Sequence, residues 1–253
     1  MDWLRALPIA HRGLHDAAIG VVENSPSAFE AAARAGYGIE LDVVISADGE
    51  AIVFHDKDLN RVTKETGLVR THRAAELTQI LLEGSADTIP RLADVFDLVR
   101  GRVPLLIEIK NANRQVGELE ARVAKLLSTY QGPAAVQSFN PYSMAWFASN
   151  ASDVVRGQLS QDFRYYDEKP MPDFQRFLLR HMLLNVVSRP HFVAYDCEAL
   201  PAIGPGAARK LGLPLLCWTV KSLEMQAQIR PYADNIIFEG FRPPLGAPET
   251  ANA

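Results

Sequence analysis

The chain has 253 residues, of which 48% are hydrophobic and 22% are charged. This is an ordinary composition for a soluble globular protein, and it excludes collagen-like, low-complexity and mostly disordered chains. The 26 Lys and Arg against 30 Asp and Glu give a net charge of −4, which argues against nucleic acid as a partner.

The cysteine count and the hydropathy indicate the compartment. Two cysteines, Cys197 and Cys217, are too few for a disulfide framework and suit a reducing environment. No apolar run approaches the roughly 18 residues of a membrane-spanning helix, and residues 1–10 lack the basic start and long apolar stretch of a signal peptide. We expect a cytoplasmic protein without stable membrane insertion, and the oligomeric state stays open.

Short apolar runs of β-type residues alternate with longer helical patterns along the whole chain. This order is typical of parallel strands joined by crossover helices. The predicted strands, one more than a closed eight-stranded barrel needs, are Pro8–Ala10, Ile39–Val43, Ala51–Phe54, Leu105–Ile109, Ala134–Gln137, Val155–Leu159, Phe192–Tyr195, Leu215–Val220 and Asn235–Phe238.

The predicted helices have readable ends. Ser25 is an N-cap before a proline at the first helical position, and Gly36 ends the Ala-rich stretch that follows. The remaining helical patterns cover residues 74–82, 92–100, 116–130, 142–149, 174–184, 206–211 and 223–229.

The alternation favours an α/β fold, the TIM (β/α)8 barrel, over a doubly wound sheet, because no glycine-rich dinucleotide loop follows the first strand. No linker divides the chain, so we expect a single domain over residues 1–253. Residues 57–89 are polar, turn-rich and longer than a usual strand-to-helix connection. We expect them to form a small insertion after the second strand region, over one end of the barrel.

Two acids alternate with apolar residues in the second predicted strand. A period of two places Glu40 and Asp42 on one face. Barrel strands are covered on both sides, so two carboxylates facing inward would repel each other and lose hydration unless a cation compensates. The strand therefore indicates a metal site, and a solvated edge strand is the alternative.

The strand Leu105–Ile109 repeats this arrangement, with Glu108 and then Lys110 on the same face. A salt bridge between them at a strand end is the simple interpretation. Together with the two acids of the second strand, Glu108 is better interpreted as a third hard oxygen ligand. An all-oxygen site suits a divalent cation such as Mg²⁺ or Ca²⁺ rather than zinc, and the sequence does not separate the two.

Two histidines directly follow predicted strands. His11, with Arg12 beside it, follows the first strand, and His55 follows the strand Ala51–Phe54. Beside three acids, these two imidazoles are candidates for proton transfer. The other four histidines are treated as background: His15, His72, His181 and His191.

These residue types match the requirements of phosphodiester cleavage. Displacement at phosphorus needs charge neutralisation on the phosphoryl oxygens, a base for the nucleophile and an acid for the leaving alkoxide. Arg12 suits bidentate contact with a phosphate, and Lys110 supplies a point charge. The unperturbed pKa of a histidine side chain is near ~6.5, so two histidines can share the proton transfers.

An ordered series of short motifs from about residue 8 to 238 resembles the glycerophosphodiester phosphodiesterase family. The motifs are His11-Arg12-Gly13, Glu23-Asn24, Glu40-Leu41-Asp42-Val43, Asp48-Gly49, His55-Asp56, Glu108-Ile109-Lys110, Ser138-Phe139 and Trp218-Thr219-Val220. The resemblance implies a TIM barrel enzyme that hydrolyses glycerophosphodiesters to sn-glycerol 3-phosphate and an alcohol with a divalent cation.

The resemblance also implies roles for single residues. Glu40, Asp42 and Glu108 are similar to the family's metal ligands, and His11 and His55 to its acid–base pair. Arg12 and Lys110 match phosphate contacts, and Glu23 matches an acid near the metal. Asn24 is expected to orient that acid or a histidine. Trp218 would form an apolar wall near the glycerol or, alternatively, belong to the core. The insertion at residues 57–89 would carry substrate selectivity.

One departure from the family pattern concerns the last strand. Phe238-Glu239-Gly240-Phe241 stands where a Thr-Asp-x-Pro pattern is common, which leaves the contribution of this strand to the pocket open. No residue expected to bind metal or transfer protons is lost.

Two alternatives to this small-molecule phosphodiesterase remain. The same centre could cleave lysolipids in a phospholipase D-type reaction through a cyclic phosphate, or the barrel could bind a phosphorylated metabolite without catalysis. The sequence does not separate water from the glycerol 2-hydroxyl as nucleophile, does not assign acid and base between the histidines, and does not name the preferred alcohol.

Overall fold

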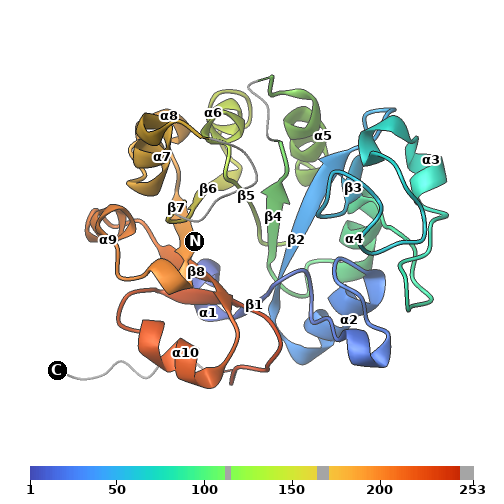
Figure 1. Ribbon diagram of the computed structural model, residues 1–253, viewed down its shortest axis with the longest axis horizontal. Helices are drawn as coiled ribbons and strands as arrows, with labels where there is room; N and C mark the ends of the chain where they lie inside the picture. The colour runs from blue at the N-terminus through green and yellow to red at the C-terminus, as the bar shows by residue number, and fades with distance from the viewer. Residues whose placement is uncertain (112–114, 164–170, 246–253) are drawn as a thin grey trace.

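The computed structural model describes residues 1–111, 115–163 and 171–245. Its strands are β1 (Ile9–Ala10), β2 (Gly38–Ile45), β3 (Ala51–Val53), β4 (Leu105–Ile109), β5 (Ala134–Ser138), β6 (Val155–Ser160), β7 (Phe192–Asp196), β8 (Leu215–Val220) and β9 (Asn235–Phe238). The sheet order is β1-β9-β8-β7-β6-β5-β4-β2-β3, and β1 also pairs with β2. Eight parallel strands therefore close into a TIM barrel, as predicted (Figure 1).

The ninth predicted strand lies outside the barrel. β3 pairs antiparallel with β2, with Val43 opposite Val53 and Ile45 opposite Ala51. The turn between them contains Gly49, whose φ of +79° is a left-handed conformation that glycine adopts without strain. β3 thus returns along β2 instead of crossing over to the next parallel strand.

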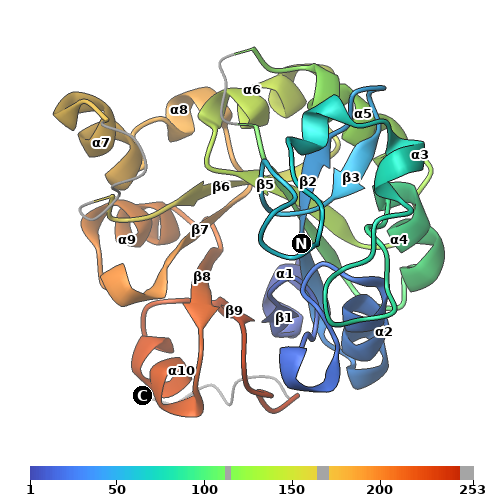
Figure 2. The same ribbon diagram turned by 45° about the vertical axis from the view of Figure 1, so that its right-hand side comes forward.

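Helices surround the barrel (Figures 1 and 2). They are α1 (Trp3–Ala6), α2 (Pro26–Ala35), α3 (Ala74–Leu77), α4 (Leu92–Val99), α5 (Glu118–Leu127), α6 (Pro141–Asn150), α7 (Asp173–Arg180), α8 (Asn185–Ser188), α9 (Ile203–Lys210) and α10 (Leu223–Ile229). The predicted start of α2 is confirmed, since the Ser25 hydroxyl accepts a hydrogen bond from the amide of Ala28 and Pro26 begins the helix.

Two helices end four or five residues earlier than predicted. The pattern over residues 174–184 ends at Arg180, because Met182 adopts a φ of +56° that a helix does not allow. The pattern over 74–82 gives only the single turn Ala74–Leu77, because Leu81 and Leu82 form isolated β-bridges with Thr88 and Thr63. The sequence also missed the one-turn helices α1 and α8.

Alternation along the strands separates two apolar layers. Ile39 and Leu41 of β2, with Leu105 and Ile107 of β4, pack outward against the helices. The opposite faces fill the barrel with a second cluster, to which α1 adds Leu4. The strand residues of this cluster are Ile9, Leu106, Ala135, Leu159, Phe192, Ala194, Leu216 and Ile237. Most of the next inward positions toward the carboxyl ends of the strands are polar, among them Glu108 after Leu106, Gln137 after Ala135 and Glu239 after Ile237. The apolar cluster therefore forms the floor of a polar centre.

The insertion expected at residues 57–89 lies between β3 and α4 and contains α3 and the 3₁₀ turn Val69–Thr71. It packs on a hydrophobic cluster of its own, which includes Leu59, Leu77 and Leu82 and also takes Val44 and Ile52 from the β2–β3 hairpin. The antiparallel hairpin therefore forms the base on which the insertion is built.

We expect Gly157→Ala to destabilise the barrel. A Cβ at Gly157 would lie 2.2 Å from ring atoms of Phe192, which fills the barrel floor beside it. Overpacking of this kind costs about 1–3 kcal/mol. Gly206→Ala in α9 is the control, because no heavy atom lies within 4 Å of its added Cβ and alanine favours a helix by about 1 kcal/mol over glycine. Urea denaturation should give opposite signs, and equal stabilities would contradict the packing described.

Candidate active site

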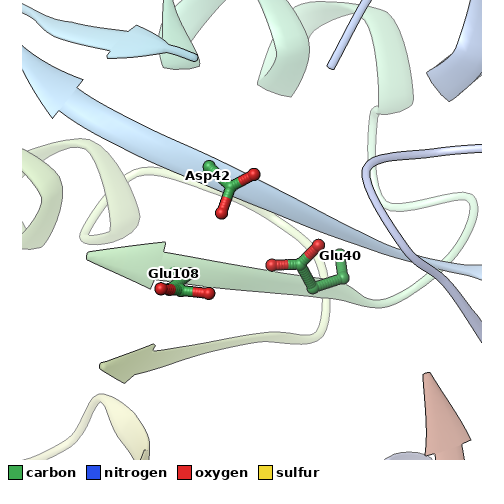
Figure 3. A group of neighbouring side chains, drawn as sticks. All are labelled: Glu40, Asp42 and Glu108. Carbon is green, nitrogen blue, oxygen red and sulfur yellow. The ribbon is translucent and has the colours of Figure 1, made fainter. Parts of the chain in front are cut away.

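Three carboxylates converge inside the barrel. Glu40 and Asp42 come from β2 and Glu108 from β4, and the parallel register places Asp42 opposite Glu108. One oxygen of each side chain lies within 4.8 Å of the others, and all three side chains are buried. Figure 3 shows the three carboxyl groups turned toward one another between the two strands. The alternation in the sequence predicted this convergence.

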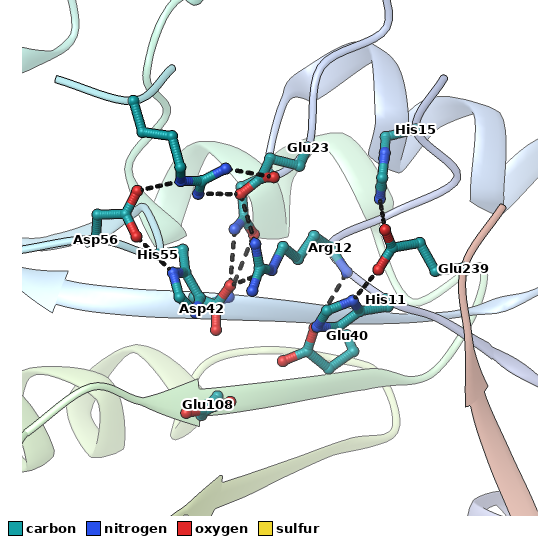
Figure 4. A network of polar contacts seen from close by, with 12 residues as sticks. His11, Arg12, His15, Glu23, Glu40, Asp42, His55, Asp56, Glu108 and Glu239 are labelled. Carbon is teal, nitrogen blue, oxygen red and sulfur yellow. Dashed lines mark hydrogen bonds and ion pairs between the residues drawn. The ribbon is translucent and has the colours of Figure 1, made fainter. Parts of the chain in front are cut away.

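Two side-chain cations contact the carboxylates (Figure 4 shows the Arg12 side). Arg12 Nε lies 3.3 Å from an oxygen of Asp42, and its backbone amide donates to Glu40 at 3.1 Å. Lys110 Nζ lies 3.0 Å from Asp42 and 2.6 Å from Glu108. The set has three carboxylates and two cations. One dication and one phosphodiester anion together would bring its formal charge to zero.

The carboxylates differ in their pKa values. Burial and repulsion from Asp42 and Glu108 raise the pKa of Glu40 well above its ordinary value. Burial also raises the pKa of Glu108, and Lys110 offsets only part of this effect. For Asp42 the charges of Lys110 and Arg12 outweigh burial and hold its pKa below the ordinary value. Glu40 thus carries the most unfavourable negative charge of the three.

His11 contacts the carboxylate of Glu239, the residue directly after the last barrel strand. Its Nδ1 lies 2.7 Å from Glu239 Oε2, and its Nε2 lies 3.9 Å from Glu40. His15 faces the second oxygen of Glu239 at 4.0 Å. The hydrogen bond to His11 outweighs burial and lowers the pKa of Glu239 to about 2. The segment that departs from the family pattern therefore contributes directly to the polar centre.

His55 reaches the site in a different way from the one that the sequence indicated. It does not follow a parallel barrel strand, because β3 is antiparallel. The return of β3 along β2 instead places His55 beside Asp42, since the amide of Phe54 donates to the Asp42 carbonyl. Its Nδ1 lies 2.7 Å from Asp56. Burial lowers the pKa of His55, and the charge of Asp42 opposes this effect.

Arg61, an arginine of the insertion, contacts both the carboxylate beside Arg12 and the carboxylate beside His55. Arg61 donates to Glu23 and to Asp56, while Glu23 also accepts from Arg12 at 2.7 Å (Figure 4). Burial would raise the pKa of Glu23, but the hydrogen bonds and charges of Arg61 and Arg12 outweigh it and lower this pKa to about 2. Through Arg61 the insertion contacts the carboxylate that holds His55.

Asn24 contacts a different partner from the expected one. Its side-chain amide donates to Asp42 at 2.8 Å, and its carbonyl oxygen accepts from the backbone amide of Asp42 at 3.2 Å. Asn24 has a φ of +54°, a left-handed conformation that asparagine tolerates better than most residues. The expectation that it orients Glu23 or a histidine is therefore wrong, because it orients Asp42, one of the three buried carboxylates.

Trp218 lies in β8, two residues before its carboxyl end. It packs edge-on against Phe139 with ring centroids 5.5 Å apart, and Phe139 meets Phe163 at 6.3 Å. The indole N–H is buried and has no hydrogen-bond partner within the ranges the structure describes. The residue is half-buried, so it offers both an apolar wall and an unused donor.

Sequence reasoning gave no role to four residues that take part in the polar contacts around His11, His55 and Glu23. They are His15, Asp56, Arg61 and Glu239. The signal for Glu239 was its position two residues after Ile237, which faces the barrel interior. His15 is no longer background, whereas His72, His181 and His191 contact groups outside this network.

The barrel fold with this polar centre at the carboxyl ends of its strands defines a TIM-barrel enzyme class. Comparisons with known proteins identify the family. The model of the Glycerophosphoryl diester phosphodiesterase family matches residues 11–238, and the chain belongs to this family of phosphodiester hydrolases. This supports an enzyme over the non-catalytic alternative.

Curated relatives carry the same family name. A glycerophosphodiester phosphodiesterase of Caldanaerobacter subterraneus subsp. tengcongensis is 28% identical over 245 residues, which cover 92% of this chain and 94% of that protein. One of Bacillus altitudinis is 36% identical over 164 residues, 60% of this chain and 66% of that protein.

Solved structures share the fold. An Oleispira antarctica phosphodiesterase, in complex with the product sn-glycerol-3-phosphate, has a TM-score of 0.75 and 22% identity, covering 92% of this chain and 93% of that one. Glycerophosphodiester phosphodiesterase from Thermotoga maritima has a TM-score of 0.69 and 26% identity, covering 92% and 94%. In the described part of this chain, no helix has the length and hydropathy to cross a membrane.

Proposed function

We propose that the chain hydrolyses glycerophosphodiesters to sn-glycerol 3-phosphate and an alcohol, with a divalent cation and general acid–base catalysis by His11 and His55. The observation that carries the proposal is the convergence of three buried carboxylates within 4.8 Å beside two imidazoles that are each held by a carboxylate at 2.7 Å. The product bound to the Oleispira antarctica phosphodiesterase supports the substrate class.

The residues fit a hard dication. Glu40, Asp42 and Glu108 offer an all-oxygen donor set, which suits Mg²⁺ or Ca²⁺. Glu40 Oε1 is buried without a hydrogen-bond partner among the described residues. The pKa of Glu40 stays raised because the charges of Lys110 and Arg12 do not outweigh burial and repulsion from Asp42 and Glu108. A bound dication would neutralise charge on the phosphoryl oxygens.

The side chains around the carboxylates supply the remaining steps. Arg12 and Lys110 hold the phosphodiester anion. One histidine accepts the proton of the attacking hydroxyl, and the other donates a proton to the leaving alkoxide. Glu239 and Asp56 each contact the Nδ1 atom of one histidine at 2.7 Å, which leaves its Nε2 available for proton transfer. Trp218 forms the wall beside the glycerol, and Glu23 and Asn24 support Arg12 and Asp42.

Residues 1–253 act as one phosphodiesterase domain. The insertion at residues 57–89 sets the substrate selectivity of this domain. Residues 246–253 lie outside the described residues. The substrate is a small molecule of lipid and glycerol metabolism, and the enzyme works in the cytoplasm.

A second candidate, phospholipase D-type cleavage of lysolipids, is favoured by one surface feature. Phe174 and Phe177 of α7 are 72% and 52% exposed. The Ser160 hydroxyl at the end of β6 donates to the carbonyl of Leu179 in α7, which places this helix at the edge of the barrel that carries the site. An acyl chain would have an apolar surface to contact there.

A substrate panel tests the function. Release of sn-glycerol 3-phosphate would be measured on glycerophosphocholine and glycerophosphoethanolamine, and release of lysophosphatidic acid or its cyclic form on lysophosphatidylcholine, each with Mg²⁺, Ca²⁺ or chelator. We expect cation-dependent product from the two water-soluble diesters and loss of product with chelator. Lysophosphatidic acid or its cyclic form as the main product would establish the second candidate. Full turnover in chelator would contradict the metal role.

We also expect cation binding to release protons. The raised pKa values of Glu40 and Glu108 mean that these carboxyls hold protons at a higher pH than ordinary carboxyls. A dication binds the deprotonated forms, so its affinity should fall as the pH falls and rise toward alkaline pH. Calorimetry in two buffers of different ionisation enthalpy should show net proton release that shrinks as the pH rises. Heats independent of the buffer at every pH would contradict this.

A further inference from the structure

The strand ladder brings His11 and Glu239 side by side although 228 residues separate them. β1 pairs with β9, with Ile9 opposite Ile237, and both residues face the barrel interior. His11 lies two positions after Ile9, and Glu239 lies two positions after Ile237. The side chains of His11 and Glu239 therefore point to the same side of the sheet.

The backbone on both sides of this contact is fixed. The His11 amide donates to the Phe238 carbonyl at 2.9 Å, and the Glu239 amide donates to the Val220 carbonyl at 2.9 Å. Neither residue can shift along its strand without losing a ladder bond. The short contact between the side chains is therefore set by the barrel itself.

The contact has a defined direction. Glu239 Oε2 lies 2.7 Å from His11 Nδ1, while His11 Nε2 lies on the side of the acid cluster, 3.9 Å from Glu40. A carboxylate is only an acceptor, so it favours the proton on Nδ1 and leaves the lone pair of a neutral imidazole on Nε2. That is the nitrogen which faces the substrate position.

The charge of Glu239 is not shared with an arginine or lysine at ion-pair distance in the described ranges. Its ion-pair partners there are His11 and, at 4.0 Å, His15. In contrast, Asp56, which holds His55, also pairs with Arg61. Glu239 therefore acts mainly on an imidazole, whereas Asp56 also belongs to a network that fixes the insertion.

From this geometry we propose that Glu239 is the positioning residue of His11, which sets its tautomer and ring orientation and does not touch the substrate. The proposal rests on the proposed function of His11 in proton transfer. Groups that orient a functional histidine in this way are worth about 10–100-fold in activity when they orient metal ligands, and a misplaced tautomer costs more in serine proteases.

Three variants of the full chain test the role. Glu239→Leu removes the acceptor, Glu239→Gln keeps a neutral acceptor, and Glu224→Gln in α10 is an exposed control. We expect Glu239→Leu to lower kcat about 10–100-fold with KM and cation affinity nearly unchanged. Glu239→Gln should lose less, and Glu224→Gln should match the wild type. Wild-type kcat in Glu239→Leu would overturn the proposal.

A spectroscopic readout separates this proposal from the proposed function. Long-range ¹H–¹⁵N NMR at alkaline pH should place the proton of wild-type His11 on Nδ1, and Glu239→Leu should lose this preference. An unchanged tautomer in Glu239→Leu would overturn the positioning role even if activity fell. If the wild-type chain hydrolyses no glycerophosphodiester, the proposed function fails, whereas the NMR result still decides what Glu239 does to His11.

Discussion

Glu40→Gln is expected to lower kcat at least about 10³-fold, which is about 4 kcal/mol of transition-state stabilisation, while raising the melting temperature of the cation-free protein. The side chain is buried, and repulsion from Asp42 and Glu108 makes its negative charge unfavourable. A folded-state pKa above the unfolded value means that ionisation costs stability as the pH rises through it. A neutral amide removes this cost and keeps an acceptor for the Arg12 amide.

Asp42→Asn is the matched comparison, because it should lose the same activity with the opposite effect on stability. The pKa of Asp42 is held low by Lys110 and Arg12, so its charge stabilises the fold at neutral pH and this contribution is lost as the pH falls. The variant leaves Lys110 with a weaker partner. Scanning calorimetry with and without Mg²⁺ should show opposite shifts for the two variants in the cation-free state. Equal shifts would contradict the charge balance described here.

His11→Ala and His55→Ala are each expected to lower kcat by about 10² or more without loss of the fold. Each imidazole is the proposed proton carrier on its side of the three carboxylates, and no other described histidine lies at hydrogen-bond distance from Glu239 or Asp56. Steady-state kinetics on glycerophosphocholine would measure the loss, and circular dichroism would confirm the fold.

His72→Ala provides the control for the histidine variants. This residue lies in the insertion, where its ring contacts Glu76 at 3.9 Å, so near wild-type turnover is expected. Near wild-type turnover in both His11→Ala and His55→Ala would refute the acid–base assignment.

The sequence predicted the barrel and the acid cluster because both depend on local patterns. Ile39 to Val43 alternate strictly, which fixes the inward face of Glu40 and Asp42, and the barrel needs only the regular order of strands and helices. The prediction was less accurate at the hairpin. A short apolar run does not reveal whether it pairs parallel or antiparallel. From the sequence, β3 is therefore a possible barrel strand and His55 is expected at the end of it. The antiparallel pairing of β3 with β2 shows that this expectation is wrong, although His55 still reaches the site.

The contacts between distant segments could not be predicted. Glu239 and His11 meet only because β9 closes the barrel against β1, and Arg61 reaches Glu23 only once the insertion has folded. Single carboxylates and arginines are common on protein surfaces, so their types alone carry little information. Such pairs form only when the sheet closes. A strand pattern in the sequence indicates that the sheet closes but does not give the register in which the strands pair.

The most direct test of the account is an anomalous diffraction experiment on crystals of the whole chain grown with Mn²⁺. We expect one strong peak about 2.2 Å from oxygens of Glu40, Asp42 and Glu108, with His11 and His55 on the same side of the barrel. A peak elsewhere, or none among these oxygens at saturating Mn²⁺, would contradict it.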